Sequence, residues 1–170
     1  MIYRTLGRTG LKVSLVSYGS GGPSKLGQNT GLSSNDQDAL IHRCIDEGIN
    51  LFDTSEAYGD SESILAHGLK DVPRAEYVIA TKCRYLDRSG AMRSADDIAK
   101  SIENSLVRLN VDCVDVFQFH VFNSKHYFDV VDQQYPVLKR FQEQGKIRFI
   151  GFSEQFKVEH NHEGVVLGLE

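Results

Sequence analysis

The chain has 170 residues and a formal net charge of −4, with 19 Lys and Arg residues against 23 Asp and Glu residues. This length suits one domain with its own apolar core. The basic residues are scattered, so no electrostatic surface for nucleic acid is expected. No apolar run approaches the length that crosses a membrane. We therefore expect neither nucleic acid nor a membrane as a partner.

The cysteines and the amino terminus bear on the cellular compartment. Cys44, Cys83 and Cys113 lie far apart, and an odd number argues against a disulfide framework. The first residues carry charges and glycines where a signal peptide needs an apolar core. We therefore expect a cytoplasmic protein with reduced thiols, and we expect Cys83 to be a buried structural thiol.

The first elements in the chain are predicted to be a hairpin and a strand. Residues 3–14 place turn residues between two β-forming segments, which is typical of a hairpin. Residues 13–20 predict a buried strand that ends at Gly19. A glycine-rich loop follows, without the spacing of a phosphate-binding fingerprint. After it, Ser34 or Asn35 can cap a helix.

From this point apolar strands alternate with amphipathic helices. The helices are expected at 36–49, 61–70, 94–110 with Ser94 as the cap, and about 127–144. The further strands are expected at 49–53, 76–82, 112–120 and 147–153. Such alternation indicates repeated βαβ units and a parallel sheet covered by helices.

Each expected strand ends in a distinctive residue on the side where the chain turns toward a helix. These residues are Gly19, Asp53, Lys82, His120 and Ser153. The carboxyl ends of parallel strands lie on one rim, so residues far apart in sequence should converge there. Tyr58, in the loop after Asp53, should join them.

Four of these side chains form a set suited to carbonyl chemistry. A phenol has a reference pKa of about 10 and is a poor proton donor at neutral pH. An ammonium about 4 Å away contributes on the order of 4 kcal/mol at an effective dielectric near 20. We therefore expect Lys82 to lower the pKa of Tyr58, and Asp53 to keep Lys82 charged. His120 would donate to a substrate carbonyl, and a hydride-donating cofactor would be required.

The sequence resembles the aldo-keto reductase family. The matching segments are YRTLGRTGLKVS, GINLFDTSEAYGDSE, VIATKC, SLVRLNVDCVDVFQFH and GKIRFIGFS, in order between Tyr3 and Phe156. The resemblance implies a (β/α)8 barrel that reduces aldehydes and ketones, or oxidises alcohols, with NADPH or NADH. Residues 68–83 and the amino terminus look most like a branch with sugar dehydrogenases such as L-galactose dehydrogenase, which implies a small carbonyl or sugar substrate.

The resemblance also implies roles for single residues. It makes Tyr58 the general acid/base, Lys82 and Asp53 the pair that tunes its pKa, and His120 the residue that orients the carbonyl. The implied cofactor-binding residues are Gly19, Ser20, Asp53 and Ser153. Relatives usually carry Asn after the serine that matches Ser153, whereas Glu154 stands here and is expected to place a carboxylate near the nicotinamide amide.

The expected fold class is α/β, a TIM-type (β/α)8 barrel truncated to about five strands and four helices plus an N-terminal hairpin. Residues 1–156 would form the partial barrel and 157–170 a divergent tail. The family holds the cofactor's phosphates with strands seven and eight, so a truncated form with little activity is one interpretation. Open sheet edges also predict self-association.

Two other functions stay open at this point. One is a non-catalytic cofactor-sensing or regulatory protein on the same scaffold, like the potassium-channel β subunits that resemble these reductases. The other is a Schiff-base enzyme with Lys82 as the nucleophile, which needs a neutral amine and is opposed by Asp53. His160 and His162 could chelate a metal, but no further ligand has an evident spacing, so we expect no metal site.

Overall fold

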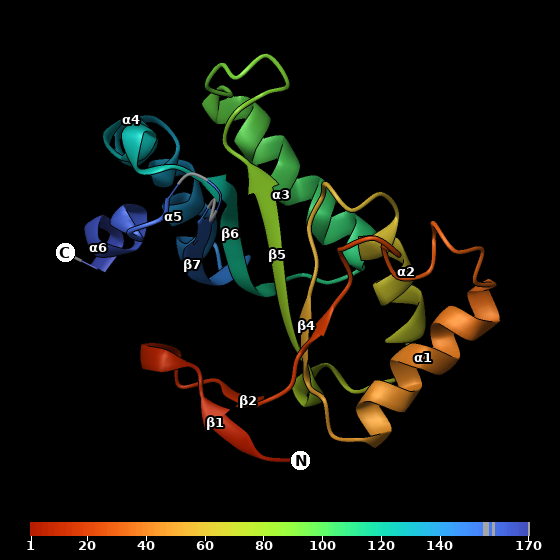
Figure 1. Cartoon of the computed structure of the whole chain (residues 1–170). Coiled ribbons are helices and arrows are strands. Elements are labelled where there is room, and N and C mark those ends of the chain that lie inside the picture. Colours follow the sequence, from red (N-terminus) through yellow and green to blue (C-terminus); the bar gives the residue numbers. More distant parts are fainter. Residues whose placement is uncertain (155–156, 158, 170) are drawn as a thin grey trace.

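The computed structural model describes residues 1–154, 157 and 159–169 (Figure 1). Its strands are β1 (Tyr3–Thr5), β2 (Lys12–Ser14), β3 (Tyr18–Gly19), β4 (Leu51–Asp53), β5 (Val78–Arg84), β6 (Val114–Phe122) and β7 (Ile147–Glu154). Its α-helices are α1 (Ser34–Asp46), α2 (Ser61–Gly68), α3 (Ala95–Leu109), α4 (Tyr127–Gln133), α5 (Tyr135–Glu143) and α6 (Glu163–Leu169). Short 3-10 turns lie at Gly7–Thr9, Arg74–Glu76 and Ser124–His126. The expected boundary between partial barrel and tail, at 156, lies outside the described residues.

The centre of the molecule is a parallel sheet in which sequence neighbours are also spatial neighbours. Its order is β3-β4-β5-β6-β7, and each adjacent pair is parallel. The helices lie on its outer side, with α1, α2 and α3 over one half and α4, α5 and α6 over the other (Figure 1). This arrangement is part of an α/β barrel, as the sequence predicts.

Side-chain alternation along the strands divides the core in two. The outer layer lies between sheet and helices and includes Ile41, Leu65, Ile79, Cys83, Ile102, Phe117 and Leu138. The inner cluster joins Leu11 and Val13 of the hairpin region to Val78, Ala80 and Val116 of the sheet. The β1-β2 hairpin therefore covers the amino-terminal end of the strands, as Figure 1 shows. Lys82, two residues after Ala80, faces the same interior.

The predicted hairpin is confirmed, but the first strand of the sheet is much shorter than predicted. Only Tyr18–Gly19 pair with β4, whereas Leu15 and Val16 are 65% and 55% exposed. The Ser14 hydroxyl donates to the Val16 carbonyl at 2.7 Å, so the chain turns where the sequence predicts a continuous buried strand. The expected end at Gly19 is correct.

The predicted helix caps are right in one case and wrong in the other. Ser94 caps α3 as expected, because its hydroxyl accepts from the Asp97 amide at 3.1 Å. Helix α1 is capped by Ser33 and begins at Ser34, so the expected caps Ser34 and Asn35 lie inside the helix. The sequence pattern cannot separate these positions, because consecutive Ser and Asn residues all suit an N-cap.

The helix expected at 127–144 is two helices, α4 and α5, that meet at Gln134. Pro136 lies in the first turn of α5, where its missing N–H costs nothing, but a continuous helix would lose a hydrogen bond there. Gln134 is fully buried, and its amide donates to the carbonyls of Tyr85 at 3.0 Å and Arg93 at 2.7 Å. The junction therefore fastens the loop after β5.

The segment expected to be a divergent tail, 157–170, contains α6. Added methyl groups at Gly164 and Gly168 would meet the rings of Phe122 and Phe152, so this helix packs directly on the outer side of β6 and β7. Two small residues four positions apart permit this close approach. Within the described part of the chain, no helix is long and apolar enough to cross a membrane.

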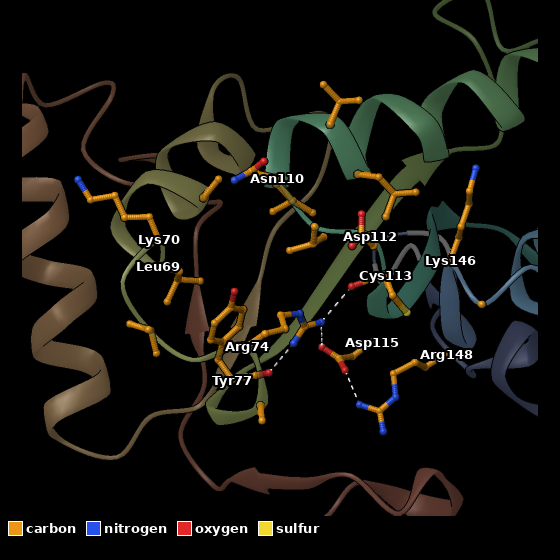
Figure 2. A pocket seen from close by; sticks show the side chains of 18 of the residues that line it. Leu69, Lys70, Arg74, Tyr77, Asn110, Asp112, Cys113, Asp115, Lys146 and Arg148 are labelled. Atoms are coloured by element: carbon orange, nitrogen blue, oxygen red, sulfur yellow. Dashed lines mark hydrogen bonds and ion pairs between the residues drawn. The ribbon is translucent and has the colours of Figure 1, made fainter.

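The amino-terminal ends of β5, β6 and β7 are tied together by the buried carboxylate of Asp115 (Figure 2). This carboxylate accepts from the Ile79 amide at 2.8 Å, from Arg74 at 2.7 Å and from Arg148 at 2.6 Å. A hollow of about 1420 Å³ lies beside it. The carboxylate is fully used within the fold, so we assign this cluster a structural role.

Candidate active site

The opposite, carboxyl-terminal end of the sheet gathers the four residues that the sequence singles out. Asp53 ends β4, Lys82 lies near the end of β5, and His120 lies near the end of β6. Tyr58 follows β4 in the loop that leads to α2. Parallel strands in register bring these positions to one rim, because Lys82 pairs with Gln118 two residues before His120.

Lys82 and Asp53 form an ion pair inside the barrel. The ammonium donates to Asp53 Oδ1 at 2.5 Å and to the Thr54 carbonyl at 2.9 Å. Lys82 is only 5% exposed, whereas the Asp53 side chain is 37% exposed. The ammonium lies 5.5 Å from the centre of the Tyr58 ring. A buried ammonium thus has its counter-charge in direct contact.

Tyr58 and His120 face each other at the mouth of the barrel. The Tyr58 hydroxyl lies 3.4 Å from His120 Nε2, and the two rings meet edge to face with centres 5.5 Å apart. Gly21 lies directly against this tyrosine, because a methyl group there would be 2.8 Å from two ring carbons. Because the Tyr58 hydroxyl and His120 Nε2 are close neighbours, a single oxygen atom at the mouth of the barrel can contact both.

The pKa of Tyr58 is shifted in the direction opposite to the expected one. Burial raises it above its ordinary value near 10, and the Asp53 carboxylate raises it further. The net shift is therefore opposite to the one expected from Lys82, because burial disfavours the phenolate and the Asp53 carboxylate, which holds the ammonium, disfavours it further. Tyr58 consequently holds its proton at neutral pH.

His120 is neutral at physiological pH. Its pKa falls from 6.5 to about 4, first because of burial and then because of the charges of Lys82 and Arg84, with Glu56 acting weakly in the other direction. A neutral imidazole can donate from one nitrogen only. Which nitrogen donates depends on the contact that the other one makes.

Two contacts around Tyr58 and His120 were not anticipated from the sequence. Ser55 places its hydroxyl 3.1 Å from His120 Nδ1. Gln28, from the glycine-rich loop, donates to the Tyr58 carbonyl at 3.0 Å and accepts from the Asp60 amide at 2.9 Å. Neither residue type carries a signal by itself. Only the position of Ser55, between Asp53 and Tyr58, points toward the rim.

The residues expected near a nicotinamide differ in their exposure and in their free hydrogen-bonding groups. Ser153 pairs with His120 across the sheet, so it belongs to the same rim. Gln118, one interior position below His120, has a buried side-chain oxygen without a hydrogen-bond partner, which suits an amide donor. Ser20 is fully buried, and its hydroxyl donates to the Asp53 carbonyl at 3.1 Å. Gly19 is exposed and has open space beside it.

Glu154 does not reach toward the interior as expected. Its carboxylate accepts from the Val165 amide at 3.1 Å and contacts His162 Nδ1 at 2.7 Å. It therefore caps the first turn of α6 on the outer side of the sheet. Alternation explains the correction, because Ser153 faces inward and its successor faces outward. Among the described residues, no cluster of three or more His, Cys, Asp or Glu side chains could hold a metal ion.

Comparisons with known proteins point to one family. Residues 19–163 match the family model of the Aldo/keto reductase family. The chain is 42% identical over 156 residues to L-galactose dehydrogenase of Arabidopsis thaliana, covering 88% of this chain and 47% of the relative. It is 32% identical to 6-dehydroglucose reductase of Novosphingobium aromaticivorans, covering 89% and 51%, and 32% identical to NADH-specific methylglyoxal reductase of Escherichia coli, covering 86% and 50%.

Solved structures give the same picture. A Pseudomonas aeruginosa protein described as an aldo-keto reductase superposes with a TM-score of 0.76 at 32% identity, covering 90% of this chain and 59% of that one. The holo form of an aldo-keto reductase from Bacillus halodurans gives 0.74 at 25% identity, covering 91% and 50%. The chain thus spans about half the length of the curated relatives that it matches.

Proposed function

Because the chain belongs to the aldo-keto reductase family, we propose that it is an NAD(P)H-dependent oxidoreductase. It would reduce aldehyde or ketone groups, or oxidise the corresponding sugar alcohol or hemiacetal. The observation that carries the proposal is the convergence of the Tyr58 hydroxyl and His120 Nε2, 3.4 Å apart, beside the Lys82–Asp53 pair. A carbonyl oxygen placed beside both groups would meet the Tyr58 hydroxyl and, in the tautomer protonated at Nε2, the imidazole N–H.

Tyr58 is the proposed general acid/base. A bound reduced nicotinamide would supply a hydride to the carbonyl carbon. As negative charge develops on the carbonyl oxygen, the Tyr58 hydroxyl transfers its proton to that oxygen and His120 stabilises it by a hydrogen bond. Lys82 then stabilises the phenolate that this transfer creates. Because the pKa of Tyr58 is raised, reduction starts from the correct protonation state at neutral pH.

Ser153 and Gln118 are the residues that we propose for the amide end of the nicotinamide. Both lie on the interior side of neighbouring strands, and the unpaired oxygen of Gln118 can accept from an amide N–H. Gly19 lies at the end of β3, next to Asp53, and leaves open space for the ring. The choice between NADPH and NADH follows from contacts to the adenosine end, so both are tested below.

The substrate class follows from the relatives' names and is part of the proposal. Those names describe L-galactose, 6-dehydroglucose and methylglyoxal as substrates of the respective proteins. All three are small polar molecules with a carbonyl group or its hemiacetal form. We therefore propose a small carbonyl compound or sugar for this chain.

The experiment is a steady-state assay of the purified chain, with NADPH and NADH against methylglyoxal and with both oxidised cofactors against L-galactose. We expect turnover that falls by roughly 10²-fold or more in Tyr58→Phe. Tyr135→Phe, at a tyrosine on the outer surface, should leave turnover unchanged.

Cofactor binding, measured by fluorescence, separates the alternatives. Binding without turnover would favour a cofactor-sensing regulatory protein, whereas absence of both would contradict the proposal. Borohydride trapping with the carbonyl substrate should give no adduct at Lys82, because its ammonium is held by Asp53.

A further inference from the structure

Arg84 is the last residue of β5 and lies at the mouth of the barrel. Ala80 of this strand belongs to the inner cluster and Cys83 to the outer layer. Alternation therefore turns Arg84 inward, two positions after Lys82. Arg84 also pairs with His120 in the parallel register, so both side chains leave the same face of adjacent strands, which lie about 4.8 Å apart. The arginine is thus a direct neighbour of the proposed carbonyl site.

The backbone of Arg84 is fixed by two contacts, whereas its side chain is exposed. Its amide donates to Glu56 Oε1 at 3.2 Å, and its carbonyl accepts from the Arg93 guanidinium at 2.8 Å. Within the described residues, no hydrogen bond or ion pair holds the Arg84 guanidinium. The fold therefore determines the position of this arginine on the rim and leaves its N–H groups available to a ligand.

Two carboxylates on this rim are already paired with other cations. Asp53 accepts from Lys82 at 2.5 Å, and Glu56 accepts from Arg93 at 2.9 Å. Neither carboxylate forms an ion pair with Arg84, so the mouth of the barrel carries a positive charge that these acids do not neutralise. The formal net charge of the chain is −4, so its overall composition does not account for a cation in this place.

The charge of Arg84 acts on the site itself. The pKa of His120 is lowered first by burial, then by the charge of Lys82, and next by the charge of Arg84. A guanidinium in such a position is suited to a carboxylate or a phosphate, which it can bind through two parallel N–H···O hydrogen bonds. The structure therefore offers a site for an anionic group beside the reacting carbonyl.

The strand order separates this anion site from the residues proposed for the nicotinamide amide. Arg84 lies on β5, next to His120 of β6, whereas Ser153 lies on β7, on the other side of His120. A compound whose carbonyl oxygen contacts Tyr58 and His120 can extend toward β5 without crossing the place of the amide. The anionic group is therefore assigned to the substrate.

We propose that Arg84 determines substrate preference by binding an anionic group, a carboxylate or a phosphate, of the compound whose carbonyl lies at Tyr58 and His120. The substrate class is then a carbonyl compound or sugar with a negative charge a few bonds from its carbonyl carbon. This inference rests on the proposed function for the reacting end of the substrate. Binding of the anionic group can also be measured without turnover.

The test compares compounds that differ in one anionic group. D-Galacturonate and D-galactose differ in a carboxylate, and glyceraldehyde 3-phosphate and glyceraldehyde differ in a phosphate. With NADPH or NADH, we expect kcat/KM to be about 10-fold or more higher for the anionic member of one pair, which identifies the group. The preference should decrease with added salt, because salt screens an exposed cation. Equal kcat/KM values within both pairs would overturn the proposal.

Variants then test whether the preference comes from Arg84. Arg84→Gln should abolish it, and Arg84→Lys, which keeps the charge but not the planar guanidinium, should retain part of it. Arg8→Gln removes the same charge from an exposed arginine in the hairpin, at the opposite end of the strands, and should leave the preference unchanged. A preference that survives Arg84→Gln would contradict the proposal. So would weaker NADPH binding in Arg84→Gln with an equal loss for both members of a pair, because the arginine would then bind the cofactor.

Calorimetry on the same pairs, in the presence of cofactor, separates this inference from the proposed function. If no turnover is found but the anionic compound binds about 10-fold more tightly and Arg84→Gln removes the difference, the anion site stands and the proposed function fails. If turnover exists without a preference for the anionic compound, the reverse applies. Absence of both turnover and preferential binding would contradict both.

Discussion

The ammonium of Lys82 lies 2.5 Å from the Asp53 carboxylate and donates a hydrogen bond to it. This pairing explains why a cation 5.5 Å from the Tyr58 ring does not acidify the phenol. The carboxylate cancels most of the field of the ammonium at Tyr58, and burial then decides the direction. The charge of Lys82 becomes important when Tyr58 loses its proton.

Asp53→Asn should therefore lower the pKa of Tyr58. The variant removes the carboxylate that raises this pKa and leaves the field of Lys82 uncompensated. Ultraviolet titration of tyrosinate should show one tyrosine ionising at lower pH than in the unmodified protein. Asp53→Asn/Tyr58→Phe should lack that step, which assigns it to Tyr58. An unchanged titration in Asp53→Asn would contradict the explanation.

The pKa of His120 predicts a loss of stability in acid. The folded pKa is about 4 against 6.5 for the free side chain, so the unfolded chain binds more protons between these values. Stability contributed by the neutral ring is complete above about pH 6.5 and falls as the pH drops toward 4. We expect a loss of about 1–3 kcal/mol, measured by urea unfolding. His120→Gln should lose less over the same range, and an equal loss would contradict the assignment.

The Tyr58 ring leaves no room for a side chain at position 21, so we expect glycine to be required there for steric reasons alone. Its φ is not in the left-handed region, but a methyl group would lie 2.8 Å from two carbons of the Tyr58 ring. Gly21→Ala should cost about 1–3 kcal/mol of unfolding free energy through overpacking. In a Tyr58→Ala background the same change should cost little, and this double-mutant cycle measures the coupling. Equal losses of unfolding free energy in both backgrounds would show that Gly21→Ala destabilises the protein by something other than a clash with Tyr58.

The sequence predicts those features that depend on local pattern. The alternation of strands and helices, the cap Ser94 and the convergence of Asp53, Lys82 and His120 all follow from periodicity and strand ends. It does not predict features that depend on a partner far along the chain. The position of Ser55 between Asp53 and Tyr58 places it near the rim, but its contact with His120 depends on a residue 65 positions later in the chain. The position of the Glu154 side chain could not be predicted without α6, because its carboxylate accepts from an amide in the first turn of that helix.

The free edge of β7 is expected to support self-association. Within the described residues, β7 pairs with β6 on one side and with no strand on the other. An edge of eight residues exposes unpaired backbone groups that another strand can satisfy. Light scattering should show a mass that rises with concentration, with slower amide exchange in β7. A single-chain mass at all concentrations would contradict this expectation.

Val121, next to His120, is the position where backbone strain and the site coincide. Its φ is +60°, a left-handed conformation that β-branched residues rarely adopt. The β6–β7 register shifts between His120 and Phe122. Regular alternation would turn Phe122 toward the interior beside His120, whereas the shift lets its ring pack against Phe152 on the outer side, 4.8 Å between ring centres.

Substitution of Val121 should reverse the ordinary order of alanine and glycine. Both variants remove the two γ-methyl groups, but only Val121→Gly also removes the Cβ and can adopt this φ without steric cost. We expect Val121→Gly to exceed Val121→Ala in unfolding free energy by about 1–2 kcal/mol, measured by urea unfolding. In a position with ordinary φ, glycine would be the less stable of the two. An alanine variant at least as stable as the glycine variant would mean that the left-handed conformation at Val121 carries no strain.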